Sequence, residues 1–192
     1  MKTAILIHGT CDKAEYFDDQ YPSLSNSHWF PWLQKQLLIQ NIPTQTPEIP
    51  SAYDPQYDIW KQEFERYPID RESILVGHSC GGGFLIRWLA ENKARVAKVV
   101  LIAPWLDPDR TKTTDFFDFV IDPQLIERVG ELHLLASEDD DLDIHQSVKI
   151  ITKALPAIKL HNFSDMGHFT YGQMKTEKFP ELLTILIGDG ND

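Results

Sequence analysis

The sequence predicts an α/β fold in three layers, in which a mostly parallel sheet of about six strands lies between helices. Several apolar segments are continuous runs of Val, Ile and Leu, as in parallel strands that are buried on both faces. These runs alternate with helix-like segments, so right-handed crossovers are expected between parallel strands. The length of 192 residues suits one domain, over residues 1–192, with a substantial core.

The predicted strands follow the apolar runs in chain order. They cover residues 3–8, 44–48, 74–78, 96–103, 131–137 and 157–163. The first run looks like the start of a signal peptide, but it is too short and ends at His8-Gly9 instead of a cleavage site. We therefore assign it to the first core strand.

Five helix-like segments separate these strands or follow them. They cover residues 32–38, 59–67, 81–92, 145–155 and 180–187. Pro31 precedes the first segment, and Pro180 suits the first turn of the last, where a missing N–H breaks no helical hydrogen bond. Ligands of such α/β sheets bind at the carboxyl ends of the strands.

Two connections, at residues 9–29 and 104–130, are unusually long for a compact domain. Both are rich in aromatic residues, and long loops above strand ends often bind ligands. Residues 104–130 are therefore expected to form a pocket loop or a small cap. The alternative is that the aromatic side chains only pack the loops onto the body. The residues predicted to contact substrate are Trp29, Trp105, Phe116 and Phe117.

The charge and the cysteines narrow the choice of partners and compartment. The formal net charge of −11 disfavours nucleic acids and anionic membrane surfaces as partners. No apolar run has the length of a membrane span. Cys11 and Cys80 provide no disulfide framework, so cytoplasmic residence is the expectation. The oligomeric state stays open.

The most informative segment contains Gly77-His78-Ser79-Cys80-Gly81 between an apolar strand and a helix. This is the nucleophile-elbow pattern, in which a sharp turn exposes the serine hydroxyl at a helix N-terminus. One other interpretation is a simple turn with Ser79 as a helix cap. Another is a phosphate cradle, but the sequence has neither G-x-x-x-x-G-K-[ST] nor a G-x-G-x-x-G unit of the dinucleotide-binding type.

A base and an acid for this serine follow the last two predicted strands. His168 lies in a Gly-His loop after the sixth strand, and an acidic cluster at residues 138–143 follows the fifth. Both lie at the carboxyl ends of strands, the edge at which Ser79 is expected. Asp140 is the first choice for the acid and Asp139 the second. The chain order of serine, acid and histidine is that of the α/β-hydrolase fold.

Six other histidines are considered as the base and set aside. His133 and His161 are expected to be structural residues within strands, and His145 is expected in a loop or at the surface. His78 adjoins Ser79 but is expected to face the other way on an alternating strand. His8 ends the first strand and is expected to shape the oxyanion region, and His28 is expected in a loop or at the surface. His168 is therefore the predicted base.

The predicted oxyanion hole consists of the backbone N–H groups of Cys80 and Thr10. The Cys80 thiol is an alternative nucleophile, but nothing places a base next to it.

No metal or other cofactor is expected. Asp139-x-Asp141-x-Asp143 matches the start of a calcium loop, but Ile144 and Ile150 stand where that loop needs glycine and glutamate. The sequence contains no H-E-x-x-H and no Cys-x-x-Cys, so zinc has no support.

Together these segments resemble the small α/β-hydrolases of the retinoblastoma-binding protein 9 type and their compact bacterial relatives, over nearly the whole chain. Carried over residue by residue, the family triad falls on Ser79, Asp140 and His168. Asp143-Ile144 replaces the Val-Pro pair that usually follows the acid in that family. The matching segments are Ile5-Leu6-Ile7-His8-Gly9, Trp29-Phe30-Pro31-Trp32-Leu33, Gly77-His78-Ser79-Cys80-Gly81-Gly82, Leu135-Ala136-Ser137-Glu138-Asp139-Asp140 and Gly167-His168-Phe169.

The resemblance implies a reduced hydrolase sheet, without the first two strands of the full fold, and esterase-type or acyl-transfer chemistry. The predicted reaction is hydrolysis of a small-molecule carboxylic ester, or an amide, through an acyl-Ser79 intermediate. Two alternatives stay open. One is a binding or interaction protein with a residual triad, and the other is an acyltransferase that uses the same residues.

Overall fold

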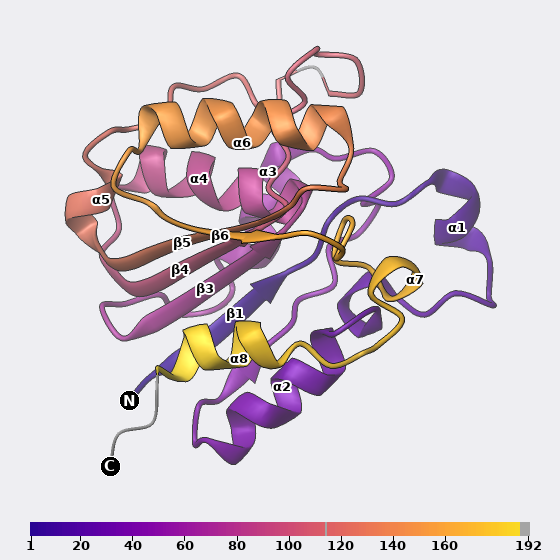
Figure 1. Ribbon diagram of the computed structural model, residues 1–192, viewed down its shortest axis with the longest axis horizontal. Helices are drawn as coiled ribbons and strands as arrows, with labels where there is room; N and C mark the ends of the chain where they lie inside the picture. The colour runs from indigo at the N-terminus through magenta and orange to yellow at the C-terminus, as the bar shows by residue number, and fades with distance from the viewer. Residues whose placement is uncertain (114, 189–192) are drawn as a thin grey trace.

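A computed structural model of the chain describes residues 1–113 and 115–188. All its strands belong to one sheet with the order β2-β1-β3-β4-β5-β6, and every neighbouring pair is parallel (Figure 1). The predicted six-stranded α/β architecture is therefore confirmed. The strands are β1 (Thr3–Ile7), β2 (Thr44–Gln45), β3 (Ser73–His78), β4 (Val96–Ile102), β5 (Val129–Ser137) and β6 (Lys159–Phe163).

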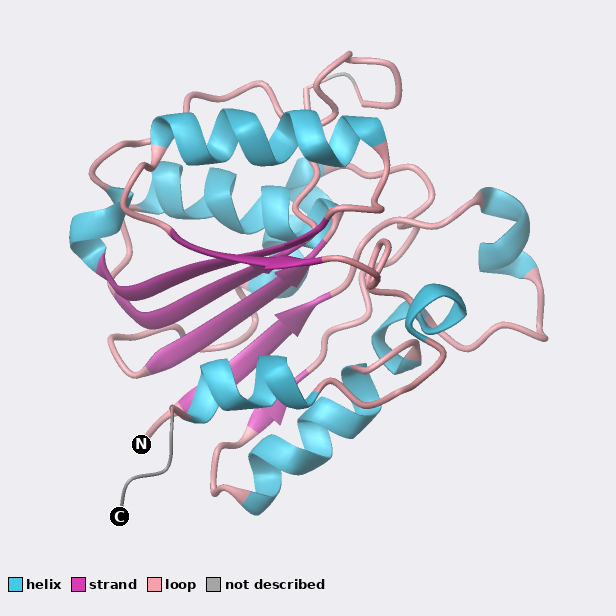
Figure 2. Ribbon diagram, viewed as in Figure 1, coloured by secondary structure: helices cyan, strands magenta, loops and turns pink. Residues whose placement is uncertain are grey.

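Helices cover both faces of the sheet. Figure 2 shows α3, α4 and α6 on one face and α2 and α8 on the other, while α1 and α7 lie beyond the carboxyl ends of the strands. The bounds are α1 (Lys13–Phe17), α2 (Phe30–Ile39), α3 (Tyr57–Phe64), α4 (Cys80–Asn92), α5 (Leu125–Arg128), α6 (Leu142–Ala154), α7 (Tyr171–Met174) and α8 (Pro180–Ile187), with a short 3₁₀ turn at Leu24–Asn26.

The structure differs from the sequence prediction mainly in its short elements. Helices α1, α5 and α7 were not predicted, because they have four or five residues each and too little length for a periodic pattern. Strand β2 is limited to Thr44–Gln45, whereas residues 44–48 were expected. Pro47 follows this edge strand and has no N–H to donate, which ends the pairing with β1.

The strand order places the functional segments next to each other. From β1 the chain first adds β2 on one side of the sheet and then adds β3 on the other side. The connections after β1 and β3 therefore diverge, and a crevice forms between them at the carboxyl edge. Thr10 follows β1 and Ser79 follows β3, so this crevice holds both residues.

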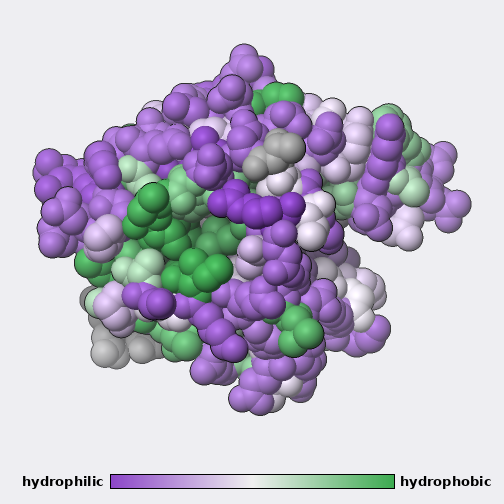
Figure 3. All heavy atoms as spheres, turned by 90° about the horizontal axis from the view of Figure 1, so that it is seen from above, coloured by the Kyte–Doolittle hydropathy of each residue, from purple (hydrophilic) through white to green (hydrophobic). Residues whose placement is uncertain are grey.

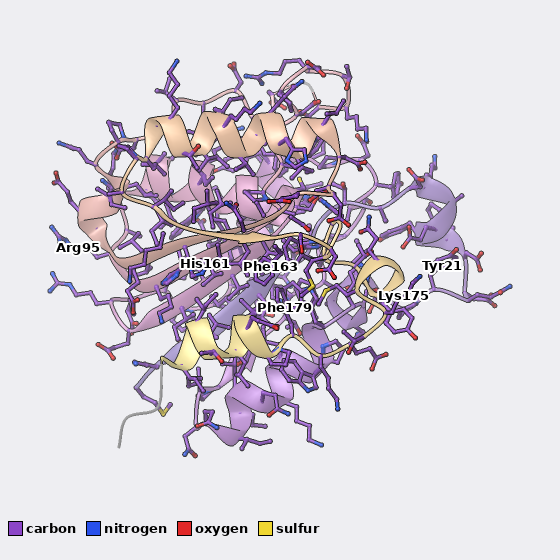
Figure 4. All side chains as sticks on the ribbon, in the orientation of Figure 1. Tyr21, Arg95, His161, Phe163, Lys175 and Phe179 are labelled. Carbon is purple, nitrogen blue, oxygen red and sulfur yellow. The ribbon has the colours of Figure 1, made fainter. Side chains whose placement is uncertain are left out.

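The α2/α8 face of the sheet is packed with aromatic rings. Figure 4 shows Phe163, at the end of β6, and Phe179, just before α8, on the same side of the sheet, and their ring centroids lie 6.1 Å apart. Phe179 also stacks on Phe169 at 5.5 Å. In the view of Figure 3, hydrophilic residues surround a large hydrophobic patch, and smaller hydrophobic areas lie elsewhere on this face.

Helix α4 begins in close contact with the end of β1. A Cβ atom added to Gly81 would lie 2.5 Å from the carbonyl oxygens of both Ile7 and His8. Because these atoms belong to the backbone, no side-chain rotation relieves the clash. The position therefore requires glycine, although a helix interior normally disfavours it.

We expect Gly81→Ala to lower the free energy of unfolding by about 1 kcal/mol. The overpacking cost of about 1–3 kcal/mol exceeds the gain of about 1 kcal/mol from helix propensity. Gly172→Ala in α7 is the matched control, because its added Cβ would meet only the Thr170 hydroxyl, at 3.8 Å. Urea unfolding of both variants measures the difference, and a Gly81→Ala protein as stable as the wild type would contradict this packing.

Candidate active site

Ser79 occupies a strained turn between β3 and α4. Its φ of 54° and ψ of −122° lie in a region that residues with a side chain rarely adopt. The backbone around it fixes this conformation: the Ser79 N–H donates to the Ile102 carbonyl at 2.9 Å, and its own carbonyl accepts from the Trp105 N–H at 3.0 Å. The expected nucleophile elbow is thus present in geometry as well as in sequence.

His168 and Asp140 form a hydrogen-bonded pair at the same edge of the sheet. The His168 Nδ1 lies 3.0 Å from Asp140 Oδ1 and 3.2 Å from Oδ2. The Asp140 side chain is 1% exposed and the His168 side chain 22%. With the Nδ1 proton donated to the carboxylate, Nε2 of the neutral ring is free to accept a proton.

Asp139, the second choice for the acid, makes different contacts. Its Oδ1 accepts hydrogen bonds from the Ser137 hydroxyl and from the Gly167 N–H, the latter at 2.9 Å. The Ser137 hydrogen bond, followed by that of Gly167, lowers the pKa of the Asp139 carboxyl. The geometry therefore assigns orientation of the His168 ring to Asp140 and attachment of the His168 loop to Asp139.

Ser79 and His168 line a common cavity of about 160 Å³. Within residues 1–113 and 115–188, no hydrogen bond joins the Ser79 hydroxyl to the His168 ring. In unliganded active sites this contact is often long and tightens only when substrate binds. The other residues of the cavity are Thr10, Trp105, Lys112, Asp141, Asp143 and Ile144.

Two further cavities adjoin this one. A space of about 510 Å³ shares Thr10, Trp105 and Lys112 with it and extends along the segment before and within α1. A smaller space of about 70 Å³ lies on another side of Ser79 and His168 and is also lined by His28 and His78. His28 was expected in a loop or at the surface. It does lie in the turn before α2 and also lines this space, where its Nδ1 accepts from the Tyr171 N–H at 3.2 Å.

The two residues predicted to supply the oxyanion hole, Cys80 and Thr10, both lie beside Ser79. Cys80 is the first residue of α4, so its N–H has no carbonyl four residues earlier in the helix. Thr10 lines the cavities on both sides of Ser79. Among the described residues, neither N–H has a hydrogen-bond acceptor.

Three of the four aromatic residues predicted to contact substrate belong to the interior. Trp29 is fully buried and stacks on Phe30, with ring centroids 4.2 Å apart. Phe116 is also fully buried and Phe117 is 3% exposed, and the Phe117 ring packs closely against Gly83 of α4. These three side chains do not line the cavity. They pack the loops onto the body of the protein, which was the alternative interpretation of the aromatic residues.

Trp105, the fourth predicted substrate contact, lines the cavity. Its indole N–H donates to Asp143 Oδ2 at 2.9 Å, and the Lys112 ammonium lies 5.7 Å from its ring centroid. Lys112 was not among the predicted site residues. It belongs to the long connection at residues 104–130, and no spacing or motif indicates that this connection returns it to Ser79.

His78 contacts the backbone of the predicted base. Its ring is 4% exposed, and its Nε2 lies 2.7 Å from the backbone carbonyl of His168. Burial lowers the pKa of His78 well below its usual range, so the ring is neutral. His8 is neutral for the same reason, because burial lowers its pKa too, and its Nε2 accepts from the Ile49 N–H at 2.9 Å.

The arrangement suits nucleophilic catalysis better than metal chemistry. No three His, Cys, Asp or Glu side chains of the described part of the chain are grouped so that they could hold a metal ion. None of the helices over the described residues combines the length and apolarity needed to cross a membrane. A serine on an elbow, a histidine and a buried carboxylate are the groups that acyl transfer requires.

Comparison with known proteins identifies the family of the chain. The family model described as serine hydrolase matches residues 21–186, and the chain therefore belongs to the serine hydrolase family. The chain is also 26% identical over 164 residues to the putative hydrolase YdeN of Bacillus subtilis (strain 168), an alignment that covers 82% of this chain and 86% of YdeN.

Solved structures share the fold. The crystal structure of the ydeN gene product of B. subtilis matches with a TM-score of 0.79 at 23% identity, over 97% of each chain. Carboxylesterase CesB of B. subtilis matches with a TM-score of 0.62 at 16% identity, over 98% of this chain and 85% of CesB. Est1E of Butyrivibrio proteoclasticus with bound ferulic acid matches with a TM-score of 0.66 at 12% identity, over 97% and 88%. The α/β-hydrolase fold is thereby confirmed.

We expect both thiols of the folded protein to react slowly. Burial, and then the charge of Glu15, raises the pKa of Cys11 to about 11, and burial raises that of Cys80 well above its usual value. At pH 7 the Cys11 thiolate fraction is then about one in ten thousand, roughly 300-fold below that of an ordinary thiol.

Reaction with Ellman's reagent tests this expectation. The native rate should rise as the pH increases towards 11, and unfolding in guanidinium should release both thiols for fast reaction. A thiol of the native protein that reacts rapidly at pH 7 would contradict the described surroundings of the two cysteines.

Proposed function

We propose that this serine hydrolase cleaves a carboxylic ester through an acyl intermediate on Ser79. The observation that supports this most strongly is the His168–Asp140 hydrogen bond, because His168 lines the same cavity as Ser79. Within the serine hydrolase family, we also propose that the chain is similar to the hydrolases of the retinoblastoma-binding protein 9 type. An amide substrate or transfer to another acceptor would use the same residues.

In the acylation step, His168 Nε2 takes the proton of the Ser79 hydroxyl as the oxygen attacks the ester carbonyl. The negative charge on the carbonyl oxygen is stabilised by the Cys80 and Thr10 N–H groups. Asp140 holds the Nδ1–H tautomer and stabilises the imidazolium. His168 then gives the proton to the leaving alcohol, which departs as the acyl-serine forms.

In the deacylation step, a water molecule takes the place of the alcohol. His168 Nε2 removes one of its protons while the water oxygen attacks the acyl carbon. Collapse of the second tetrahedral intermediate returns the proton to Ser79 and releases the carboxylic acid. The same base and the same N–H donors therefore serve both halves of the reaction.

The cavities favour an ester with one compact side. The space beside Ser79 holds only about 160 Å³, whereas the adjoining space of about 510 Å³ is within the range of small-molecule pockets. Trp105 and Lys112 line both spaces, so a ligand that bridges them would contact both side chains. The fold neighbours CesB and Est1E, a carboxylesterase and a protein with bound ferulic acid, are consistent with this substrate class.

We expect Ser79→Ala to abolish the burst of p-nitrophenol from p-nitrophenyl acetate and to lower turnover at least about 1,000-fold. Cys80→Ala is the matched control: it keeps the backbone N–H that the mechanism uses and should retain the burst. Stopped-flow absorbance measures both. Equal turnover by Ser79→Ala and the wild type would exclude the proposal, and a burst lost only in Cys80→Ala would indicate a cysteine nucleophile.

The two neighbouring aspartates should respond differently to substitution. Asp140→Asn removes the charge that holds the tautomer of His168 and should lower kcat on the order of 10³- to 10⁴-fold. Asp139→Asn retains an oxygen that can accept from Gly167 and Ser137, so its kcat should fall less than about tenfold. Steady-state ester hydrolysis compares them, and the reverse order of effects would assign the acid to Asp139.

A further inference from the structure

The loop that carries His168 is held by side chains at several successive peptide groups. We call residues 166–169 the base loop. In it, Gly167 and Phe169 have φ values of 53° and 55°, so the loop needs external contacts to keep its shape. Its side-chain hydrogen bonds are Met166 N–H to Ser137 Oγ (3.0 Å), Gly167 N–H to Asp139 Oδ1 (2.9 Å), His168 N–H to Gln173 Oε1 (2.6 Å), His78 Nε2 to the His168 carbonyl (2.7 Å) and Trp29 Nε1 to the Phe169 carbonyl (3.0 Å).

The contact from His78 differs from the others because it reaches the base residue itself from the nucleophile strand. A carbonyl oxygen only accepts hydrogen bonds, so the His78 Nε2 must carry the proton and donate it. His78 is the residue immediately before Ser79, at the end of β3. One side chain thus connects the strand that places the nucleophile to the backbone that places the base.

The surroundings of His78 fix its ring as firmly as its hydrogen bond does. The ring is buried and lies edge-on to Trp29, with centroids 5.9 Å apart, and 5.0 Å from the centroid of the His168 ring. At that separation a positive charge on His78 would oppose the imidazolium that His168 must form. A buried, neutral imidazole supplies the donor without this repulsion.

Contacts on both its ring and its backbone therefore locate His168: Asp140 orients the ring, Gln173 accepts from the backbone N–H, and His78 holds the backbone carbonyl. The distance between Nε2 of the base and the Ser79 hydroxyl depends on these contacts. Misplacement of a reacting group by about 1 Å can lower a rate about 100-fold, even when the substituted residue touches no substrate. Loss of the His78 donor also leaves the partly buried His168 carbonyl without this partner, which favours displacement of the loop.

We propose that His78 is a positioning residue for the base, whose Nε2–H sets the place of His168 relative to Ser79. Trp29 and Asp139 act in the same way on the neighbouring peptide groups of the base loop. This inference rests on the proposed function, since it assigns His78 to the same reaction. It gives a new role to two residues for which the sequence favoured other roles, Trp29 as a substrate contact and Asp139 as an alternative acid.

The test compares His78→Leu with His78→Gln in the full chain. Leucine removes the donor, whereas glutamine can place an amide N–H near the position of the histidine Nε2. With p-nitrophenyl acetate we expect His78→Leu to lower kcat on the order of 10- to 100-fold with KM changed less than about twofold, and His78→Gln to recover most of the loss. Trp29→Phe, which keeps an aromatic ring but not the indole N–H donor, should show a smaller fall of the same kind.

His133→Leu is the matched control, because it removes a buried histidine whose ring nitrogens contact His161 and Glu131, away from the base loop. It should leave kcat unchanged even if it lowers the melting temperature. Equal kcat in the wild type and His78→Leu would overturn the inference, as would an equal loss in His133→Leu or a failure of His78→Gln to restore activity. If His78→Leu does not fold, Trp29→Phe and Asp139→Ala decide the same question.

Hydrogen exchange separates this inference from the proposed function. Amide exchange of residues 166–169 requires no activity, so it can be measured even if the wild type hydrolyses no ester. Faster exchange in His78→Leu, with slow exchange in β3 and β4 retained, would support the base-loop contacts. Unchanged exchange in the base loop would overturn them, while an inactive wild type would overturn the proposed function alone.

Discussion

The conformation of the Ser79 backbone is the constraint on which the rest of the site depends. With its φ at 54°, the chain turns sharply enough for α4 to start directly against the end of β1. Such a conformation costs on the order of 1–3 kcal/mol, and the packing around it must offset that cost. The hydrogen bonds of Ser79 to Ile102 and Trp105 contribute, as do the glycines that allow close contact between backbones.

The same hydrogen bonds connect the nucleophile to the cavity wall. The Trp105 N–H binds the Ser79 carbonyl, and its indole N–H binds Asp143 in α6. Beyond Trp105, the buried Asp107 carboxylate accepts from the N–H groups of residues 111–113, which fixes the loop that carries Lys112. A series of hydrogen bonds therefore connects the cavity wall around Trp105 and Lys112 to the Ser79 turn.

Much of the fold can be predicted from the sequence, because most strands and helices correspond to continuous patterns of apolar residues that are long enough to recognise. The apolar runs predict β3, β4 and β5 to within two residues at each end, and the helix after the elbow is predicted to within one. The short α1, α5 and α7 produce no such signal, since four or five residues contain too little of a periodic pattern. The two-residue β2 was overestimated, because hydrophobicity alone does not show where proline stops strand pairing.

The candidate site is predictable to a smaller extent. The chemistry of Ser79, Asp140 and His168 follows from residue type and from their places after strands, but the preference for Asp140 over Asp139 depends on a turn and on the distant Gly167. The aromatic loop residues were assigned to the cavity because composition does not distinguish a wall from a core. Contacts such as Trp29 with Phe169, 140 positions apart in sequence, carry no local signal.

The role of Ser79 as the nucleophile is the point on which the proposed chemistry depends. Mass spectrometry of the intact protein and its peptides after treatment with a fluorophosphonate examines it without any assumption about the substrate. We predict one adduct per chain, located on Ser79 and absent from the Ser79→Ala variant. Adduct formation at another residue, or none in a folded wild-type protein, would contradict this role.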